Sequence, residues 1–200
     1  MTVPTATEPR RNQREHILDV ALDLMARRGV HGVSMRQLAQ ACGVQVAAIY
    51  HYFESKDALL AAVIEERRYS ARLADQLPAD LSGTVEERLR AVFDVFWSGA
   101  LEEQAILRLL LGEGIRGEAA ALPMGAELLQ TFRSGVAGWL PHVLPELDDP
   151  ESVAEVLVGQ VLVGFFRHVF SPGTDPATIG DECAAVLVAA VLPPAAARRS

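Results

Sequence analysis

Cysteine is nearly absent from this chain of 200 residues, which contains Cys42 and Cys183 and no others. Both lie among apolar residues at helical spacing, so the simplest interpretation is two small core residues. Two isolated thiols do not make a disulfide framework or a cysteine-rich metal site, and reduced thiols are typical of a cytoplasmic protein.

The chain also has little that resembles a membrane or export segment. Its beginning, MTVPTATEPRR, lacks the apolar core of a signal peptide. The longest apolar run, Val156 to Phe166, is interrupted by Gln160 and is too short to cross a bilayer. We therefore expect a cytoplasmic protein with no membrane partner.

Residues at catalytic or metal-binding spacing are missing as well. The histidines are scattered, without an HExxH pair or a Cys/His set. The segment Gly112–Gly117 matches neither phosphate-binding glycine pattern, and we interpret it as a flexible loop between helices. The acidic pairs Glu102–Glu103 and Asp148–Asp149 fit solvated helix ends or turns. The sequence thus predicts no enzyme, no cofactor and no metal.

A net charge of −8 argues at first against nucleic acid as a partner, but the charge is unevenly distributed. Residues 1–72 carry ten Lys/Arg and eight Asp/Glu, whereas residues 73–200 carry eight and eighteen. Arg10, Arg11 and Arg14 form a basic cluster ahead of the first predicted helix. Such a cluster either contacts DNA phosphates or remains a solvated tail, and the sequence leaves both open.

Hydrophobic residues make up 50% of the chain and recur at helical spacing almost throughout. No alternation typical of a strand stands out, so the predicted fold class is all-α. We expect helices to start at Asn12, Ser34, Gln45, Ser55 and Thr84, with the Ser55 helix reaching about Leu77. Further helices are expected at 124–140, ending before Pro141, and at 150–170 and 177–192, with a frayed tail at 193–200.

The segment from Ser34 to Leu60 is the most informative one. Ser34 is a natural N-cap, and Gln37 can complete a capping box with it. Gly43 supplies the left-handed residue that ends this helix, and Gln45 opens a second short helix. Two helices joined by a tight glycine turn form a helix-turn-helix, which places its second helix in the DNA major groove.

These residues resemble the DNA-binding segment of TetR-type (tetracycline-repressor-like) transcriptional regulators. The frame that matches consists of Ser34, Leu38–Ala39, Ala41–Val44, Ile49–Phe53 and Ser55–Leu59, after a helix ending ALDLMARRG. The resemblance implies an N-terminal three-helix DNA-binding domain, residues 1–70, followed by a larger helical ligand-binding and dimerisation domain, residues 71–200. We place the boundary within the helix that follows Ser55.

Contacts to bases are expected from the second helix. Gln45 suits adenine, His51 can bond a base edge, and Val46 and Ala47 can meet thymine methyl groups. Gln45 and Val46 depart from the family pattern, and no Arg or Lys lies between Gln45 and Phe53. We therefore expect weak base readout, with backbone contacts providing most of the affinity.

Contacts to phosphates are expected from Ser34, Arg36, Tyr50 and Lys56. Tyr50 and Lys56 follow from the family resemblance, and Arg36 from its place near the start of its helix. The helix starts at Ser34 and Ser55 would add amide donors.

The last two helices are apolar on almost every face, and such helices must be buried on several sides. Since a small subunit cannot surround both, we expect them to pair with a second copy in a twofold four-helix interface, as the resemblance also implies. A purely internal core is the alternative. The expected interface residues are Leu157, Val161, Gly164, Phe165, Val186 and Ala189.

A small-molecule pocket in the middle of the chain is implied by the resemblance. Apolar residues on predicted helices there are candidates for its lining: Phe93, Phe96, Trp97, Met124, Leu128, Phe132 and Trp139. Arg108, Arg133 and His142 are polar candidates, although we favour surface positions for the two arginines. The alternative for the apolar set is plain core.

The sequence therefore predicts a homodimeric regulator that binds double-stranded DNA at a near-palindromic operator, released by a small apolar or amphipathic effector. The alternative is a helical small-molecule sensor with weak or no specific DNA recognition. An enzyme on a helical scaffold has no residue constellation to support it.

Overall fold

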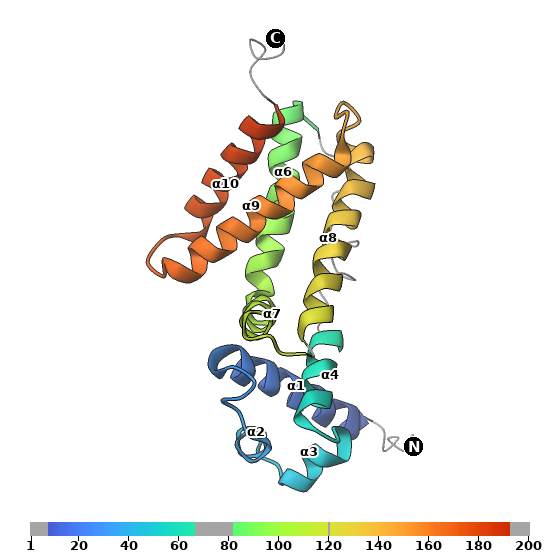
Figure 1. Ribbon diagram of the computed structural model, residues 1–200, viewed down its shortest axis with the longest axis vertical. Coiled ribbons are helices and arrows are strands. Elements are labelled where there is room, and N and C mark those ends of the chain that lie inside the picture. Colours follow the sequence, from blue (N-terminus) through green and yellow to red (C-terminus); the bar gives the residue numbers. More distant parts are fainter. Residues whose placement is uncertain (1–7, 67–81, 120, 193–200) are drawn as a thin grey trace, which may run out of the picture. The chain divides into compact units, whose positions relative to one another are not determined.

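A computed structural model describes residues 8–66, 82–119 and 121–192, with side chains from residue 13 onward (Figure 1). Within these ranges the regular structure is α-helical, which confirms the predicted all-α fold. The helices are α1 Glu8–Arg28, α2 Met35–Cys42, α3 Val46–Tyr52, α4 Lys56–Glu66, α6 Val85–Glu102, α7 Gln104–Arg116, α8 Ala121–Val143, α9 Pro150–Phe170 and α10 Pro176–Val191.

The residues group into two compact units. The first comprises Met1–Arg68 with Gln104–Ala126, and the second comprises Tyr69–Glu103 with Glu127–Ser200. Helix α7 therefore belongs with the N-terminal helices, although it lies far beyond them in sequence. The boundary between residues 70 and 71 stays a prediction.

Helix α1 is the centre of the first unit, where it packs on α2, α4 and α7 (Figure 1). Its residues Ile17, Leu18, Ala21 and Met25 are fully or almost fully buried. The helix begins at Glu8, so the predicted start at Asn12 is wrong, because Pro9 has the restricted φ angle that suits a first helical turn. The basic cluster consequently lies within α1 and not ahead of it.

The second unit is built on α6, α9 and α10, which pack against one another. Trp97 of α6 occupies its centre: the indole nitrogen donates to the carbonyl of Pro176 at 3.1 Å. A Cβ atom on Gly180 would lie 2.6 Å from the Trp97 ring, and one on Gly164 would lie 3.0 Å from it. Only residues without a side chain allow α9 and α10 to approach this ring.

Short-range signals set most helix starts. Thr84 and Glu87 form the predicted capping box of α6, and the carboxylates of Asp149 and Asp175 cap α9 and α10. The hydrogen bonds from Ser152 N to Asp149 and from Thr84 N to Glu87 measure 3.0 and 2.8 Å. The pKa of Asp149 is lowered by hydrogen bonding to the side chain and then to the backbone of Ser152, and that of Glu87 by hydrogen bonding to the backbone and then to the side chain of Thr84, because these bonds favour the charged carboxylate.

Two predicted helix ends are wrong. Helix α7 continues through the glycine-rich segment to Arg116, and Gly117 ends it with a φ of 75°, so Gly112–Gly117 is not a loop. Helix α8 passes Pro141 and reaches Val143, because burial of Leu140 and Leu144 holds the last turn in spite of the missing N–H group. The predicted course of the Ser55 helix to Leu77 and the tail at 193–200 lie outside the described residues.

Helix α9 is, among the described helices, the one long and apolar enough to cross a membrane by composition. Core helices pass the same test, and Leu157, Val161 and Phe165 of α9 are buried in the helical core. Cys42 and Cys183 are free and buried, and burial raises the pKa of both thiols. Their predicted role as small core residues is confirmed.

Candidate nucleic-acid interface

The turn between α2 and α3 has the geometry that the sequence predicts. Gln37 N donates to Ser34 Oγ at 3.2 Å, and Ser34 N donates to Gln37 Oε1 at 2.9 Å, which completes the capping box. Gly43 has a φ of 68°, and the amide of Val44 returns to the carbonyl of Ala39 at 2.9 Å. This closes α2 and leads the chain directly into α3.

One face of α3 is anchored and the other is free. Ile49 is fully buried, and Phe53 at the end of the helix is almost so. Of the predicted base-reading residues, Gln45, Ala47 and His51 are exposed, whereas Val46 is half-buried. The anchored face fixes the helix, so that its exposed side chains are held in one orientation.

The predicted phosphate-contacting residues divide into two groups. Ser34, Arg36 and Tyr50 are exposed. The Ser55 hydroxyl accepts from Ala58 N at 3.0 Å and so caps α4, as predicted. Lys56 differs, because its ammonium donates to the carbonyl of Val30 at 3.0 Å and reaches that of Val33 at 3.5 Å. Lys56 therefore stabilises the turn ahead of α2.

Arg14 of the basic cluster is also engaged within the unit. Its guanidinium pairs with Glu66 of α4 and lies 5.2 Å from the centre of the Phe53 ring. The pair with Glu66 raises the pKa of Arg14. Arg14 thus ties α1 to α4, and the side chains of Arg10 and Arg11 lie outside the described part.

Sequence reasoning missed a polar cluster in the first unit. Glu113 of α7 is 1% exposed, and its Oε1 accepts from Val30 N at 2.9 Å and from Arg116 at 2.7 Å. Beside it, His31 Nε2 lies 2.9 Å from Glu118 Oε2. No local pattern reveals this cluster, since Val30 and Glu113 are 83 positions apart.

The predicted ligand-binding residues do not line one pocket. Phe93, Phe96 and Trp97 are buried, with Phe93 stacked on Trp97, so these three belong to the core. Met124, at the start of α8, is half-buried and is grouped with the first unit, whereas the other six residues belong to the second. On α8, residues Leu128, Phe132 and Trp139 are half-buried, and the ring of Phe132 packs on that of Phe96 at 6.2 Å.

The polar ligand candidates lie at the surface. Arg133 pairs with Glu155 at 2.5 Å, and both side chains are more than half exposed. Arg108 is exposed, and so is His142, whose Nδ1 lies 3.2 Å from the carbonyl of Gly138. The surface position favoured for the two arginines is confirmed.

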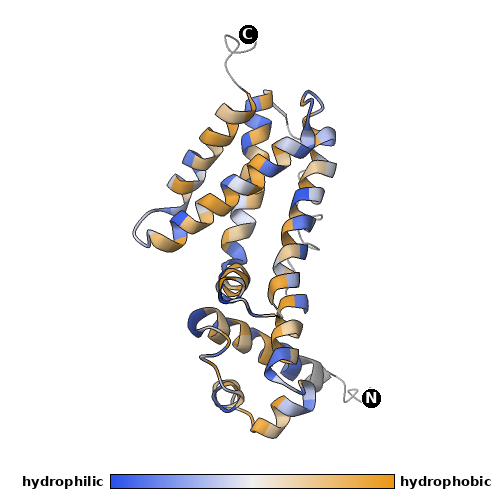
Figure 2. Ribbon diagram, in the orientation of Figure 1, coloured by the Kyte–Doolittle hydropathy of each residue, from blue (hydrophilic) through white to orange (hydrophobic). Residues whose placement is uncertain are grey.

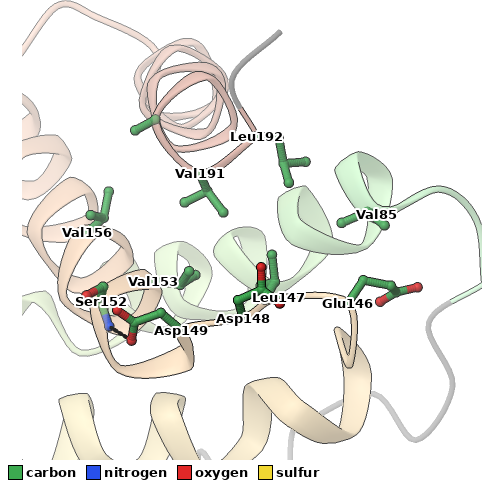
Figure 3. A pocket seen from close by; sticks show the side chains of 11 residues that line it. Val85, Glu146, Leu147, Asp148, Asp149, Ser152, Val153, Val156, Val191 and Leu192 are labelled. Atoms are coloured by element: carbon green, nitrogen blue, oxygen red, sulfur yellow. Dashed lines mark hydrogen bonds between the residues drawn. The ribbon is translucent and has the colours of Figure 1, made fainter. Parts of the chain in front are cut away.

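A recess of about 670 Å³ lies elsewhere in the second unit (Figure 3). It is open to one side and combines apolar side chains with carboxylates: Val85, Glu146, Leu147, Asp148, Asp149, Ser152, Val153, Val156, Ala190, Val191 and Leu192. None of the predicted ligand residues lines it. The pair Asp148–Asp149, interpreted as a solvated turn, forms part of its lining.

The predicted dimer residues are largely used inside one chain. Leu157, Val161, Gly164 and Phe165 are buried within the second unit, since they face α6 and α10, so they offer no exposed interface. Val186 and Ala189 are exposed.

Sequence reasoning missed other apolar residues of the same helices, which remain uncovered. Val163, Phe166 and Phe170 are 49%, 41% and 77% exposed, and the last two rings stack at 6.3 Å. The apolar character of α9 and α10 is visible in Figure 2.

Comparison with known proteins agrees with this geometry. Residues 17–63, which cover α2, α3 and most of α1 and α4, match the model of the bacterial regulatory proteins of the tetR family. Residues 17–63 therefore form a DNA-binding domain of the tetR type. HTH-type transcriptional regulator BetI of Escherichia coli is 27% identical to it, with 48% of this chain and 60% of BetI covered. This chain thus spans less than two thirds of BetI.

Solved structures of the same architecture cover nearly the whole chain. Reduced NemR of Escherichia coli has a TM-score of 0.72 at 20% identity, covering 92% of this chain and 100% of NemR. NalD of Pseudomonas aeruginosa, the secondary repressor of the MexAB-OprM multidrug efflux pump, has a TM-score of 0.66 at 20% identity, with 94% and 100% covered. At these identities the likeness shows the fold.

Proposed function

We propose that this protein, with its domain of the tetR type, regulates transcription by binding a near-palindromic DNA operator as a homodimer. The observation that carries the proposal is the capped helix-turn-helix, in which Ile49 anchors α3 while Ala47 and His51 stay exposed. A rigid helix with a free polar face is what major-groove recognition requires.

The dimer is supported by the uncovered apolar residues of α9 and α10. Val163, Phe166, Phe170 and Val186 are large side chains that remain exposed in the single chain. A twofold interface would bury them against their copies. The two recognition helices of the dimer would then bind half-sites whose centres are separated by one helical turn of DNA or a multiple of it.

Release by a small apolar or amphipathic ligand is supported by the recess in the second unit. Its valine and leucine side chains suit an apolar body, and the carboxylate of Asp148 favours a positively charged end, whereas Glu146 already pairs with Arg88 (Figure 3). For nearly complete release the ligand must favour the released state by about 5.5 kcal/mol. Repression is the expected outcome, as in the structural neighbour NalD, which is described as a repressor.

Selection of duplexes from a random DNA pool by the full chain tests the proposal. We expect enrichment of a near-palindromic sequence. The variant His51→Ala should weaken binding to that sequence relative to unrelated DNA, whereas His142→Ala, an exposed histidine in α8, should leave it unchanged. A pool without enrichment would contradict the proposal.

The second candidate is a helical small-molecule sensor without specific DNA recognition. It is favoured by the exposed face of α3, which carries no Arg or Lys between Gln45 and Phe53. Such a sensor would bind ligands, seen as a raised melting temperature, and would hold DNA only at low salt without sequence preference.

A further inference from the structure

Three potential metal ligands from distant parts of the sequence meet in the first unit. His31 lies in the turn after α1, Glu113 lies in α7, and Glu118 follows α7 directly. One ligand atom from each residue lies within 4.8 Å of the other two. The left-handed Gly117 turns the chain so that Glu118 comes back beside the end of α7.

The buried carboxylate of Glu113 is only partly satisfied by these neighbours. Its Oε1 accepts two hydrogen bonds, from Val30 N and from Arg116. Its Oε2 is buried and has no hydrogen-bond partner among the described residues. A buried carboxylate oxygen left without a partner is costly, and a cation is one way to satisfy it.

The charges around the cluster also favour a cation. Two carboxylates, those of Glu113 and Glu118, face one guanidinium, that of Arg116, which contacts Oε1 and leaves Oε2 open. The ammonium of Lys56 is engaged by the carbonyls of Val30 and Val33. His31 Nε2 and Glu118 Oε2 are hydrogen-bonded at 2.9 Å, and two ligands of one tetrahedral Zn²⁺ would lie roughly 3.3 Å apart, so a small shift of these side chains would admit the ion.

We propose that His31, Glu113 and Glu118 bind a divalent transition-metal ion of the Zn²⁺ class. An imidazole with two carboxylates suits Zn²⁺ or Co²⁺ better than Mg²⁺ or Ca²⁺, which prefer oxygen ligands alone. Three protein ligands leave a position open for water. The ion would join the turn ahead of α2 to the end of α7.

This placement gives the ion a regulatory consequence that rests on the proposed function. His31 lies three residues before the Ser34 cap of α2, so an ion that fixes His31 to α7 also restrains the start of the helix-turn-helix. The ion binds best to the turn conformation that brings His31 and Glu118 together. Binding of the ion therefore changes the affinity for DNA to the extent that DNA prefers or disfavours this same conformation.

Titration of the chelator-treated full chain with Zn²⁺ by calorimetry, and with Co²⁺ by visible absorption, tests the site without DNA. We expect one ion per chain, and a loss of affinity of at least about 10-fold in both His31→Ala and Glu118→Gln, since changes even to outer-shell partners reach this size. Glu113 is left unchanged in these variants because it also holds Val30 N.

The matched control is His142→Ala, which removes an exposed histidine of the second unit and should bind as the parent does. Equal Zn²⁺ affinity in the parent, His31→Ala and Glu118→Gln would overturn the proposal, as would the absence of Zn²⁺ and Co²⁺ binding in the parent. Because the titration needs no DNA, failure of metal binding leaves the DNA-binding proposal untouched, and failure of DNA selection leaves this result standing.

Discussion

The amide of Val30 donates a hydrogen bond to Glu113 Oε1 at 2.9 Å, which joins the turn after α1 to α7. The carbonyl of the same Val30 accepts from Lys56 of α4 at 3.0 Å. One residue of the turn, Val30, is therefore held through its N–H group by α7 and through its C=O group by α4. These two contacts help to hold the turn that leads into the helix-turn-helix.

Replacing Glu113 should expose this dependence. Glu113→Ala leaves the buried Val30 N–H without an acceptor and should lower the free energy of unfolding by about 1–3 kcal/mol. Glu113→Gln keeps a carbonyl acceptor for that N–H and should cost less. Urea denaturation measures both, with the exposed Glu102→Ala as control. Equal losses in the two Glu113 variants would argue against the Val30 contact.

Lys56 and Arg36 should respond differently to alanine. Arg36→Ala should leave the melting temperature unchanged and lower the slope of log affinity against log salt by about one, as expected for one lost phosphate contact. Lys56→Ala should lower the melting temperature, because the carbonyls of Val30 and Val33 lose a charged donor. An unchanged melting temperature in Lys56→Ala would mean that its ammonium is free for phosphate.

The close approach of α10 to Trp97 predicts a sharp contrast between two glycines. Gly180→Ala would place Cβ 2.6 Å from the indole, and overpacking of this kind costs about 1–3 kcal/mol. Gly138→Ala in α8, where the added Cβ meets nothing within 4 Å, should stabilise the helix by about 0.5–1 kcal/mol. Thermal unfolding compares the two, and a tolerated Gly180→Ala would contradict the packing.

The dimer is best tested at exposed residues of α9. Gly164 is unsuitable, because a side chain there would collide with Trp97 and disturb the core. Phe166→Glu and Val163→Glu should instead leave the chain folded and shift it to monomer in sedimentation at micromolar concentration, since each buries an unpaired charge in the interface. Leu129→Glu, at an exposed apolar residue of α8, is the control. A dimer that persists in both α9 variants would refute this interface.

Ionisation of Asp94 in α6 should lower the free energy of unfolding as pH rises in the acidic range. Partial desolvation, and then the neighbouring Asp181, raise the pKa of Asp94, while Arg90 opposes the shift. Between the unfolded pKa of about 3.9 and the higher folded value, the native state binds more protons, so stability is lost as pH rises through this window.

Asp94→Asn should therefore be more stable than the parent at pH 7, and this advantage should vanish below the unfolded pKa. Asp149→Ala gives the opposite sign, since the Ser152 bond lowers the pKa of Asp149 and its contribution is lost as pH falls. Urea titrations at several pH values compare both variants with the parent. If Asp94→Asn exceeded the parent in unfolding free energy by the same amount at pH 4 as at pH 7, the first expectation would be contradicted.

The helix-turn-helix could be predicted from sequence alone because its signals are local. The Ser34–Gln37 capping box spans three residues, and the left-handed Gly43 needs no distant partner. The alternation of buried Ile49 and exposed Ala47 and His51 likewise follows from helical periodicity. These features depend on backbone geometry within a few residues, so they can be predicted without knowing what the segment packs against.

The tertiary structure decided which side chains each apolar face meets. The apolar character of α9 was evident in sequence, yet only packing shows that Phe165 is buried while Phe166 is exposed. The family resemblance predicts that Lys56 contacts a DNA phosphate, whereas in the folded chain its ammonium donates to the carbonyl of Val30. Pairing of His31 with Glu118 arises from segments 87 positions apart. Contacts at such separations depend on how whole helices pack, and no local spacing in a sequence specifies them.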